Sequence, residues 1–383
     1  MEVPFFRLRL TSAEKKEVLD VVNSGWVTTG PKARQFEAAI SEITGVRYAV
    51  AVSSATAGLH LALATLDIGT GDEVITTPYT MAATVEAIIY TGARPIFVDI
   101  DPETLNIDAG KIEARISRKT KAIIPVDIAG WPCDYDHLQR ISRRNKIPLV
   151  QDAAHSFGAA YRNRPVGTHA DLTVFSFYST KNITTGEGGM VVSDKKVLAD
   201  RIRHLSLHGM TSSGWKRYSG GGWRYDITEL GFKYNLSDLS AALGLGQLKR
   251  LGEFQKKRST LAASYFEGLS PLLDYIELPY FDKDSSHTWH LFIIKLHPEK
   301  WKISRDRLIE ELEKKGIGCG VHFIPISHFS YFRKQLNLRP SDYPESSQAF
   351  RRVISLPFYP DLKKSEVAYV CRSLTDLAKK FGR

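Results

Sequence analysis

Short apolar runs alternate with helical segments through the first half of the chain, and this alternation limits the fold more than any other feature. The runs at 47–52, 73–78, 93–100, 121–130 and 147–154 are rich in Val, Ile and Ala. Helical patterns at 56–66, 81–92 and 134–145 lie between them. Parallel strands joined by crossover helices give this pattern. The sequence therefore predicts an α/β protein with a mostly parallel central sheet and helices on both faces.

The length of the chain, 383 residues, exceeds what one ordinary core supports. We expect a large domain over 1–250, opened by helices at 12–23 and 32–42. A helical stretch over 236–259 leads out of it. A strand at 289–296 and helices at 305–315 and 364–380 predict a smaller C-terminal α/β domain over 251–383.

Composition narrows the class of protein. The N-terminal residues lack the apolar core of a signal peptide, and no run approaches the ~18 apolar residues of a membrane span, which predicts a cytoplasmic protein. Three cysteines without metal-ligand spacing predict reduced thiols and no metal site. The net charge of +10 comes from dispersed basic residues, without a nucleic-acid-binding signature. It fits a solvated basic surface or an anionic metabolite, rather than DNA or RNA.

Lys181 is the first candidate for chemistry. It follows the apolar strand predicted at 172–177, precedes a glycine cluster at 186–189, and leads into a second short strand. Ligands gather at the carboxyl ends of parallel strands, and glycines allow close approach to a ligand. A lysine desolvated there is a nucleophile able to form a Schiff base. The plain alternative is a surface lysine.

Three further features lie at strand ends. Asp152 ends the run 147–154, His155 follows it, and the hydroxyl-rich stretch 53–56 precedes a helix, where a phosphate binds well. Each has an ordinary alternative: a helix cap, a core histidine and an N-cap. Together, a phosphate cradle, an acid and a lysine 29 residues later (181 − 152) are typical of a fold-type-I pyridoxal phosphate (PLP) enzyme, in which the acid keeps the cofactor ring electron-withdrawing.

Longer segments extend the match over nearly the whole chain. They include SGWVTTGPKARQFE (24–37), GDEVITTPYTMAAT (71–84), PIFVDIDPETLNID (95–108), QDAAHSFGA (151–159), FSFYSTKNITTGEGGMVV (175–192), ELGFKYNLSDLSAALGLGQL (229–248) and VHFIPIS (321–327). These segments resemble the DegT/DnrJ/EryC1/StrS family of PLP-dependent aminotransferases, which act on nucleotide-linked keto sugars.

The resemblance implies a role for each matching residue. Lys181 would hold the cofactor as an imine, Asp152 would pair with the pyridine nitrogen, and His155 would contact the ring hydroxyl, a position often held by glutamine. Ala55 and Thr56, assisted by Ser176, would contact the phosphate. Asn235 resembles the asparagine that reaches the phosphate from the neighbouring subunit, which implies a homodimer.

The chain departs from the family pattern near residue 81. Many relatives stack an aromatic ring on the cofactor where Met81 stands. Either Met81 packs there through its polarizable sulfur or Tyr79 takes the place. A branch that has histidine in place of the Schiff-base lysine performs dehydration, and Lys181 argues against that branch.

Substrate residues follow from the resemblance alone. Thr28, Thr29 and Gly30, the segment 215–225, Tyr178 and His322 resemble stretches that line the sugar-nucleotide pocket; His322 fits equally well as a packed strand histidine. The string KNITTGEGG favours a 4-keto over a 3-keto sugar, with glutamate as the amino donor. The alternatives are a PLP-dependent nucleotide-sugar dehydratase and a non-enzymatic regulatory member of the same fold.

Overall fold

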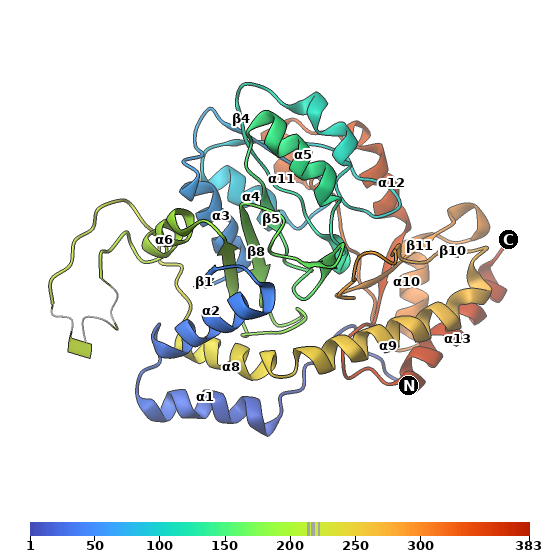
Figure 1. The fold of residues 1–383 in the computed structure, drawn as a ribbon. Coiled ribbons are helices and arrows are strands. Elements are labelled where there is room, and N and C mark those ends of the chain that lie inside the picture. The colour runs from blue at the N-terminus through green and yellow to red at the C-terminus, as the bar shows by residue number, and fades with distance from the viewer. Residues whose placement is uncertain (213–214, 216–218, 221–222) are drawn as a thin grey trace.

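The computed structural model of the chain describes residues 1–212, 215, 219–220 and 223–383 (Figure 1). Its α-helices are α1 (Ser12–Ser24), α2 (Pro31–Thr44), α3 (Ala55–Thr65), α4 (Ala82–Tyr90), α5 (Tyr135–Asn145), α6 (Lys196–Leu205), α8 (Asp238–Leu248), α9 (Leu251–Leu269), α10 (Arg305–Lys314), α11 (Ser330–Leu336), α12 (Pro344–Arg352) and α13 (Lys364–Phe381). Its strands are β1 (Tyr48–Val52), β2 (Glu73–Thr76), β3 (Arg94–Phe97), β4 (Thr120–Ile123), β5 (Val150–Asp152), β6 (Ala160–Tyr161), β7 (Arg164–Pro165), β8 (Leu172–Ser176), β9 (Gly189–Ser193), β10 (Ile276–Glu277), β11 (Phe292–Leu296) and β12 (Val353–Leu356).

The central sheet has the strand order β1-β9-β8-β5-β4-β2-β3. Parallel bridges from Ile123 to Leu149 and from Val126 to Asp152 join its two parts, β1-β9-β8-β5 and β3-β2-β4. β5 pairs in parallel with β8, and β2 pairs in parallel with β3 and β4. β9 alone in this sheet of the described chain runs antiparallel to its neighbours, because a loop without a crossover helix joins it to β8. The predicted mostly parallel sheet is confirmed.

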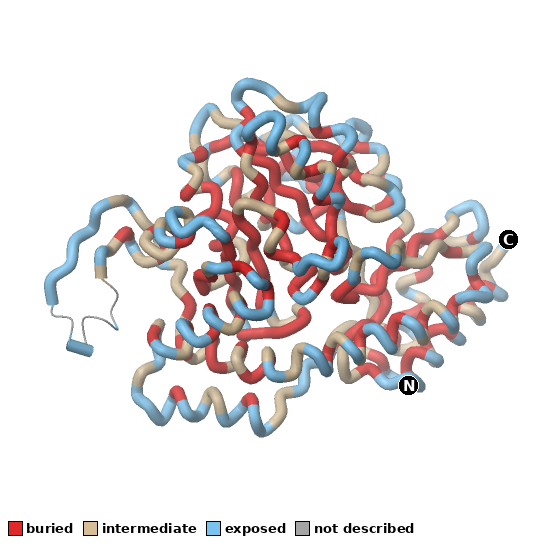
Figure 2. The backbone as a smooth tube through the Cα atoms, in the orientation of Figure 1, coloured by how far each residue is buried: buried red, intermediate tan, exposed pale blue. Residues whose placement is uncertain are grey.

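Helices cover both faces of the sheet. Along β8, Leu172 and Val174 pack in one core with α3, α4 and α6, whereas Phe175 packs in the opposite core with α2 and α8. On β4, Ile123 packs against α5 in a third cluster, which includes Leu138. Alternate side chains of a strand point to opposite faces, so a strand buried on both faces reads as a continuous apolar run. Figure 2 shows the sheet buried at the centre and exposed residues along the outer helices.

The C-terminal part forms a second sheet, β10-β11-β12, which is antiparallel and packs against α9, α10 and α13. The start of the chain joins this core: Val3 is fully buried in it and pairs with Ile317. The division into 1–250 and 251–383 stays a prediction, and the first residues of the chain belong by contact with the smaller part.

Several strands are shorter than predicted, and two elements differ in kind or in where the chain turns. The helical stretch 236–259 is two helices, α8 and α9, because Arg250 has a φ of −107° and a ψ of 1°, which interrupt the helical ladder. The strand predicted over 121–130 ends at Ile123. Pro125 has no N–H to continue a ladder, and Ala129 and Gly130 take positive φ values of 58° and 98°, so the chain turns there.

Asp238 holds the N-terminus of α2 from a distant part of the chain. Its carboxylate, 2% exposed, accepts hydrogen bonds from the backbone N–H groups of Gly30 (2.7 Å), Ala33 (2.9 Å) and Lys32 (3.1 Å). These N–H groups lie where a helix has no partners of its own, and the carboxylate also complements the helix dipole.

Replacing Asp238 by alanine should therefore lower the free energy of unfolding by about 2–3 kcal/mol, since buried donors lose a charged acceptor. Urea unfolding followed by circular dichroism measures this. Ser304→Ala is the matched control, because Ser304 caps α10 with one bond to Arg307 N–H at the surface and should cost only about 1 kcal/mol. Equal losses of unfolding free energy in the two variants would contradict the role of Asp238 at the N-terminus of α2.

Candidate active site

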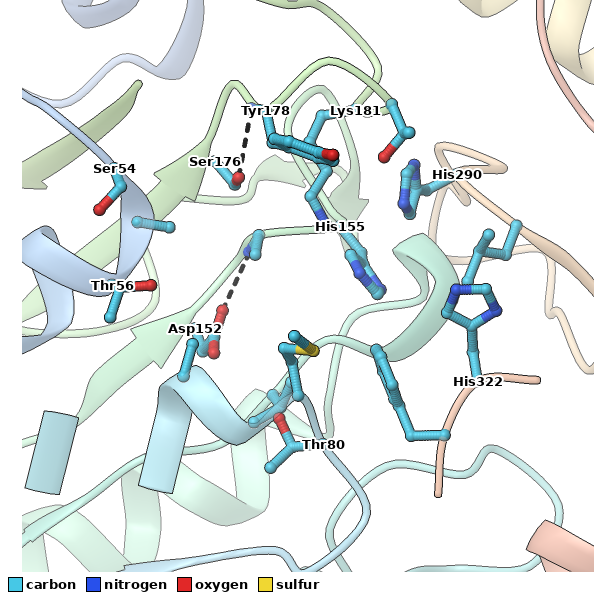
Figure 3. A pocket seen from close by; sticks show the side chains of 18 of the residues that line it. Ser54, Thr56, Thr80, Asp152, His155, Ser176, Tyr178, Lys181, His290 and His322 are labelled. Carbon is cyan, nitrogen blue, oxygen red and sulfur yellow. Dashed lines mark hydrogen bonds between the residues drawn. The ribbon is translucent and has the colours of Figure 1, made fainter. Parts of the chain in front are cut away.

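A pocket of about 400 Å³ lies where the carboxyl ends of the central strands meet the C-terminal part of the chain (Figure 3). One side of it comes from the start of α3, the segment before and into α4, the end of β5 and the β8–β9 loop. The opposite side comes from residues 290–291, 322–323 and 356–358 and from the N-terminal segment. Phe5, Phe6 and Phe358 make part of this wall apolar. The pocket thus joins polar groups at strand ends with an apolar cover.

Lys181 projects into this pocket from the β8–β9 loop, with its backbone N–H bonded to Tyr178 O at 3.0 Å. Burial disfavours the charged ammonium and lowers the pKa of Lys181 to about 8, although the Asp152 carboxylate opposes this shift. A free amine near neutral pH is a competent nucleophile and base. Lys181 therefore lies in a pocket and is only partly exposed, unlike a plain surface lysine.

The lowered pKa predicts how the cofactor-free protein reacts with PLP. Only the free amine attacks, so the rate of covalent attachment should rise through pH 8 and level off above it, whereas a surface lysine would keep gaining reactivity toward pH 10.5. Stopped-flow absorbance of the bound cofactor measures this rate. Between about pH 8 and 10.5 the unfolded chain binds this proton and the folded chain does not, so the stability of the cofactor-free protein should also rise with pH there. A rate still rising steeply above pH 9.5 would contradict a desolvated Lys181.

Asp152 ends β5 with its carboxylate 5% exposed. Thr84 Oγ1 donates to Asp152 Oδ2 (2.8 Å), and Ala154 N–H donates to Oδ1 (3.2 Å). Burial raises the pKa of Asp152, and these hydrogen bonds and Lys181 offset part of that rise. Thr84, which Thr80 contacts at 2.8 Å, was not singled out from the sequence. Thr84 is a fully buried threonine on α4, and its contact with Asp152 can be recognised only once α4 is placed against β5.

The start of α3 forms the opposite end of the pocket. Ser54 caps the helix by accepting from Ala57 N–H (3.0 Å), and Ser54, Ala55 and Thr56 line the cavity. Gly189 of β9 approaches so closely that a Cβ there would lie 2.7 Å from Ala55 N. Backbone N–H groups at a helix N-terminus favour a phosphate. Ser176, also in the lining, adds a hydroxyl.

Three histidines line the pocket together. His155 and His290 have ring centroids 4.4 Å apart, and His322 lies beyond them on the C-terminal side (Figure 3). Burial, with the nearby Lys181 charge, lowers the pKa of His155 and His290 well below the usual value and that of His322 to about 4. All three are therefore neutral at pH 7. His290 was missed from the sequence because it belongs to the C-terminal part and only the fold brings it here.

The structure separates the two candidates near residue 81. Met81 lines the pocket and is 60% exposed in the single chain. Tyr79 is fully buried behind the lining and donates its hydroxyl to His322 O at 2.6 Å. Tyr178 also lines the pocket. Of the two, Met81 is the one placed to contact a ligand.

Other predicted residues lie outside this pocket in the single chain. Asn235 Nδ2 donates to Thr29 Oγ1 (2.5 Å), Thr29 Oγ1 donates to Leu236 O (2.5 Å), and Gly30 N–H is bonded to Asp238. Thr28 is exposed nearby, with its carbonyl bonded to Asp238 N–H. Within the segment 215–225, Trp215 packs edge-on against Trp26 at 4.8 Å, and residues 216–218 and 221–222 lie outside the described part. Thr28, Thr29, Gly30 and Asn235 thus form a second cluster, outside the pocket.

The sequence profile of the DegT/DnrJ/EryC1/StrS aminotransferase family matches residues 9–375. The chain belongs to this family. It is a PLP-dependent sugar aminotransferase, as its similarity to other members of the family also indicates. The chain is 44% identical to the uncharacterized protein MJ1066 of Methanocaldococcus jannaschii over 97% of this chain and 96% of that protein. It is 41% identical to the spore coat polysaccharide biosynthesis protein SpsC of Bacillus subtilis, over 98% and 97%.

Solved structures agree with this assignment. The putative sugar aminotransferase Spr1654 of Streptococcus pneumoniae in its pyridoxamine form superposes with a TM-score of 0.93 at 34% identity, over 99% of this chain and 100% of that one. Its PLP form gives the same TM-score and identity, over 99% of each chain. The pocket of this family member fits the cofactor: it offers an amine of lowered pKa, a buried carboxylate and a helix N-terminus.

Proposed function

We propose that this aminotransferase moves an amino group from an amino acid, L-glutamate, to a keto sugar of a nucleotide diphosphate, with a 4-keto sugar favoured. The observation that supports the chemistry most strongly is the convergence of Lys181, Asp152 and the start of α3 on one pocket. The sugar and the donor rest on the resemblance of KNITTGEGG and its surroundings to the family.

The residues have distinct tasks in this proposal. PLP, when bound, supplies an electron sink that stabilises charge on the carbon losing its proton. Lys181 would hold the cofactor covalently; its freed amine would take the proton from the donor α-carbon in the first half-reaction and deliver a proton to the carbon that receives the amine in the second. Asp152 would keep a positive charge on the ring nitrogen. Ser54, Ala55, Thr56 and Ser176 would hold the phosphate, and Met81 would contact the ring.

The apolar wall and the exposed apolar side chains support two further parts of the proposal. The N-terminal Phe5 and Phe6 cover the pocket and exclude water from the reacting groups.

Trp223, Ile227 and Leu230 are 79%, 58% and 90% exposed in the single chain, and exposed apolar patches mark interaction surfaces. We infer a homodimer in which the partner's copy of the second cluster (Thr28, Thr29, Gly30 and Asn235) completes the pocket.

SpsC, by its name a polysaccharide biosynthesis protein, suggests a surface polysaccharide as the destination of the sugar.

The test uses the two half-reactions in turn. L-glutamate should convert the bound cofactor to its pyridoxamine form, with loss of the visible band and release of 2-oxoglutarate. A panel of nucleotide-linked 4-keto and 3-keto sugars is then offered, and only a true acceptor restores the band. Recovery with a 4-keto sugar supports the proposal. Recovery with a 3-keto sugar alone corrects the position, and release of water without use of glutamate would replace aminotransfer by dehydration.

No helix in the described ranges is both long and apolar enough to span a lipid bilayer.

A further inference from the structure

A tight turn at 128–131 is hydrogen-bonded to residues 288–290, which lead into the C-terminal wall of the pocket. Ala129 and Gly130 have φ values of 58° and 98°, so the backbone there is held in the left-handed region. Ala129 O accepts from His290 N–H (3.0 Å), and Gly130 O accepts from Thr288 N–H (3.1 Å). A Cβ on Gly130 would lie 2.2 Å from Thr288 Oγ1, so the two segments are in close contact.

The same turn fixes one nitrogen of His155. Ala129 N–H donates to His155 Nδ1 at 3.3 Å, so this nitrogen is an acceptor and the hydrogen of the neutral ring is on Nε2. The ring lies between His290 and Phe323, whose centroids are 4.4 and 5.7 Å away. Thr288 Oγ1 also donates to His155 O (3.0 Å), which anchors its backbone.

Asn106 closes this turn from both ends. Its Oδ1 accepts from Ile128 N–H (2.9 Å), and its Nδ2 donates to Trp131 O (3.1 Å). The side chain is 3% exposed. The partners determine the amide orientation, because the N–H of Ile128 requires an acceptor and the C=O of Trp131 requires a donor. An aspartate has no amide donor and an alanine has neither group, so neither can make both bonds.

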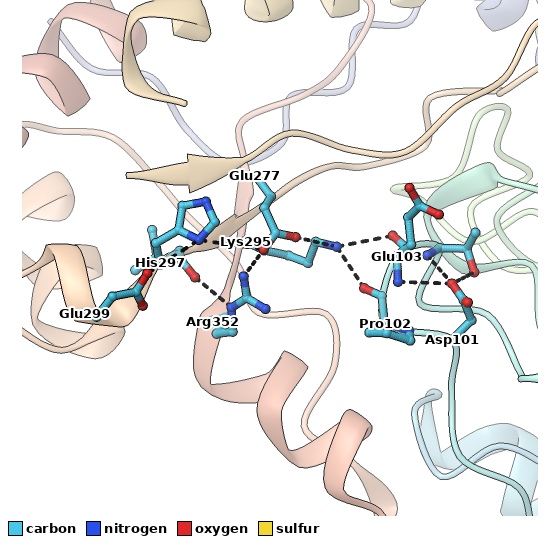
Figure 4. A network of polar contacts seen from close by, with 10 residues as sticks. Asp101, Pro102, Glu103, Glu277, Lys295, His297, Glu299 and Arg352 are labelled. Carbon is cyan, nitrogen blue, oxygen red and sulfur yellow. Dashed lines mark hydrogen bonds and ion pairs between the residues drawn. The ribbon is translucent and has the colours of Figure 1, made fainter. Parts of the chain in front are cut away.

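The loop that carries Asn106 is itself anchored across the two sheets (Figure 4). Lys295 of β11 donates to Pro102 O (2.8 Å) and Glu103 O (3.3 Å), and pairs with Glu277 (2.9 Å). Asp101 N–H donates to Asn106 O (2.8 Å), which closes the loop. Asn106 is therefore held in place independently of any ligand.

We propose that Asn106 is a positioning residue for His155: by closing the 128–131 turn it keeps Ala129 N–H on Nδ1 and makes Nε2–H a hydrogen-bond donor toward the pocket. The nature of the group that receives this hydrogen bond, the cofactor ring hydroxyl, rests on the proposed function. The tautomer of His155 and its dependence on Asn106 do not rest on the proposed function.

The tautomer can be read directly by NMR. Protein carrying ¹⁵N-labelled histidine is examined without cofactor at pH 7 through the long-range couplings of the ring nitrogens, and His155→Gln assigns the His155 signals. The wild-type protein should show an unprotonated Nδ1 and a protonated Nε2. Asn106→Asp and Asn106→Ala should convert His155 to a mixture of tautomers. In the loaded enzyme these variants should lower kcat by about ten- to a hundredfold, by analogy with the loss of a partner that orients a metal-ligating histidine.

Two controls separate positioning from general damage. Asn145→Asp removes the amide of an exposed asparagine, which donates to Ile141 O on α5 (2.9 Å), and should leave the His155 signals unchanged. In a His155→Ala background, Asn106→Asp should change kcat by less than about twofold, because its effect acts through His155. A proton on Nδ1 in the wild-type protein would overturn the proposal even if the Asn106 variants fail to fold, and so would an unchanged tautomer in folded Asn106 variants. Failure to bind PLP would instead refute the proposed function.

Discussion

The Lys181→Ala protein should lose covalent attachment of PLP and at least about 10³-fold in transamination rate, since it lacks both the nucleophile and the proton carrier. PLP should still bind through the start of α3 and Asp152, but its absorbance should be that of the free aldehyde. Difference spectra and the rate of 2-oxoglutarate release measure the two effects.

Lys195→Ala is the matched control for this variant. Lys195 is an exposed lysine that pairs with Asp171 away from the pocket, and its loss should leave spectrum and rate unchanged. A Lys181→Ala protein that keeps the wild-type band and turnover would show that another amine carries the cofactor.

Asp152→Asn should be the second most damaging change, with kcat reduced on the order of 10²- to 10³-fold, the usual loss when one charge-stabilising group is removed from an active site. The amide keeps the shape and can still accept from Thr84, but it cannot hold a positive charge on the ring nitrogen. PLP binding should weaken less than kcat falls, because the phosphate contacts remain. Half-reaction rates with L-glutamate under single-turnover conditions isolate the proton-removal step.

Asp127→Asn tests whether any buried carboxylate beside β5 behaves in this way. Asp127 is fully buried and accepts from Gln151, Ser156, Tyr135 and Cys133 N–H. Its replacement should cost about 2–3 kcal/mol of stability, because buried donors lose a charged acceptor, with a much smaller effect on proton removal. If Asp127→Asn slowed proton removal as much as Asp152→Asn, the special role of Asp152 would be wrong.

The sequence predicted the sheet and two polar groups of the pocket because both follow from local pattern. Apolar runs separated by helices require parallel strands, and the carboxyl ends of such strands share one edge, so Asp152 and the loop with Lys181 had to meet. The antiparallel β9 and the break between α8 and α9 needed backbone detail that one string of residues does not carry.

The residues missed from the sequence are those whose partners lie far along the chain. Thr84 contacts Asp152 only because α4 packs beside β5, and His290 reaches His155 from the C-terminal part. Asn106 is an ordinary loop asparagine until the 128–131 turn is placed against it. The choice between Met81 and Tyr79 likewise depended on which side chain faces the cavity, and the structure places Met81 there.

The attachment of the cofactor to Lys181 can be fixed chemically and mapped. The PLP-loaded enzyme is reduced with borohydride, digested, and analysed by tandem mass spectrometry. A single modified peptide is expected, with the pyridoxyl phosphate mass on Lys181. A label on another lysine, or none on a protein that is active and shows the visible band, would contradict it.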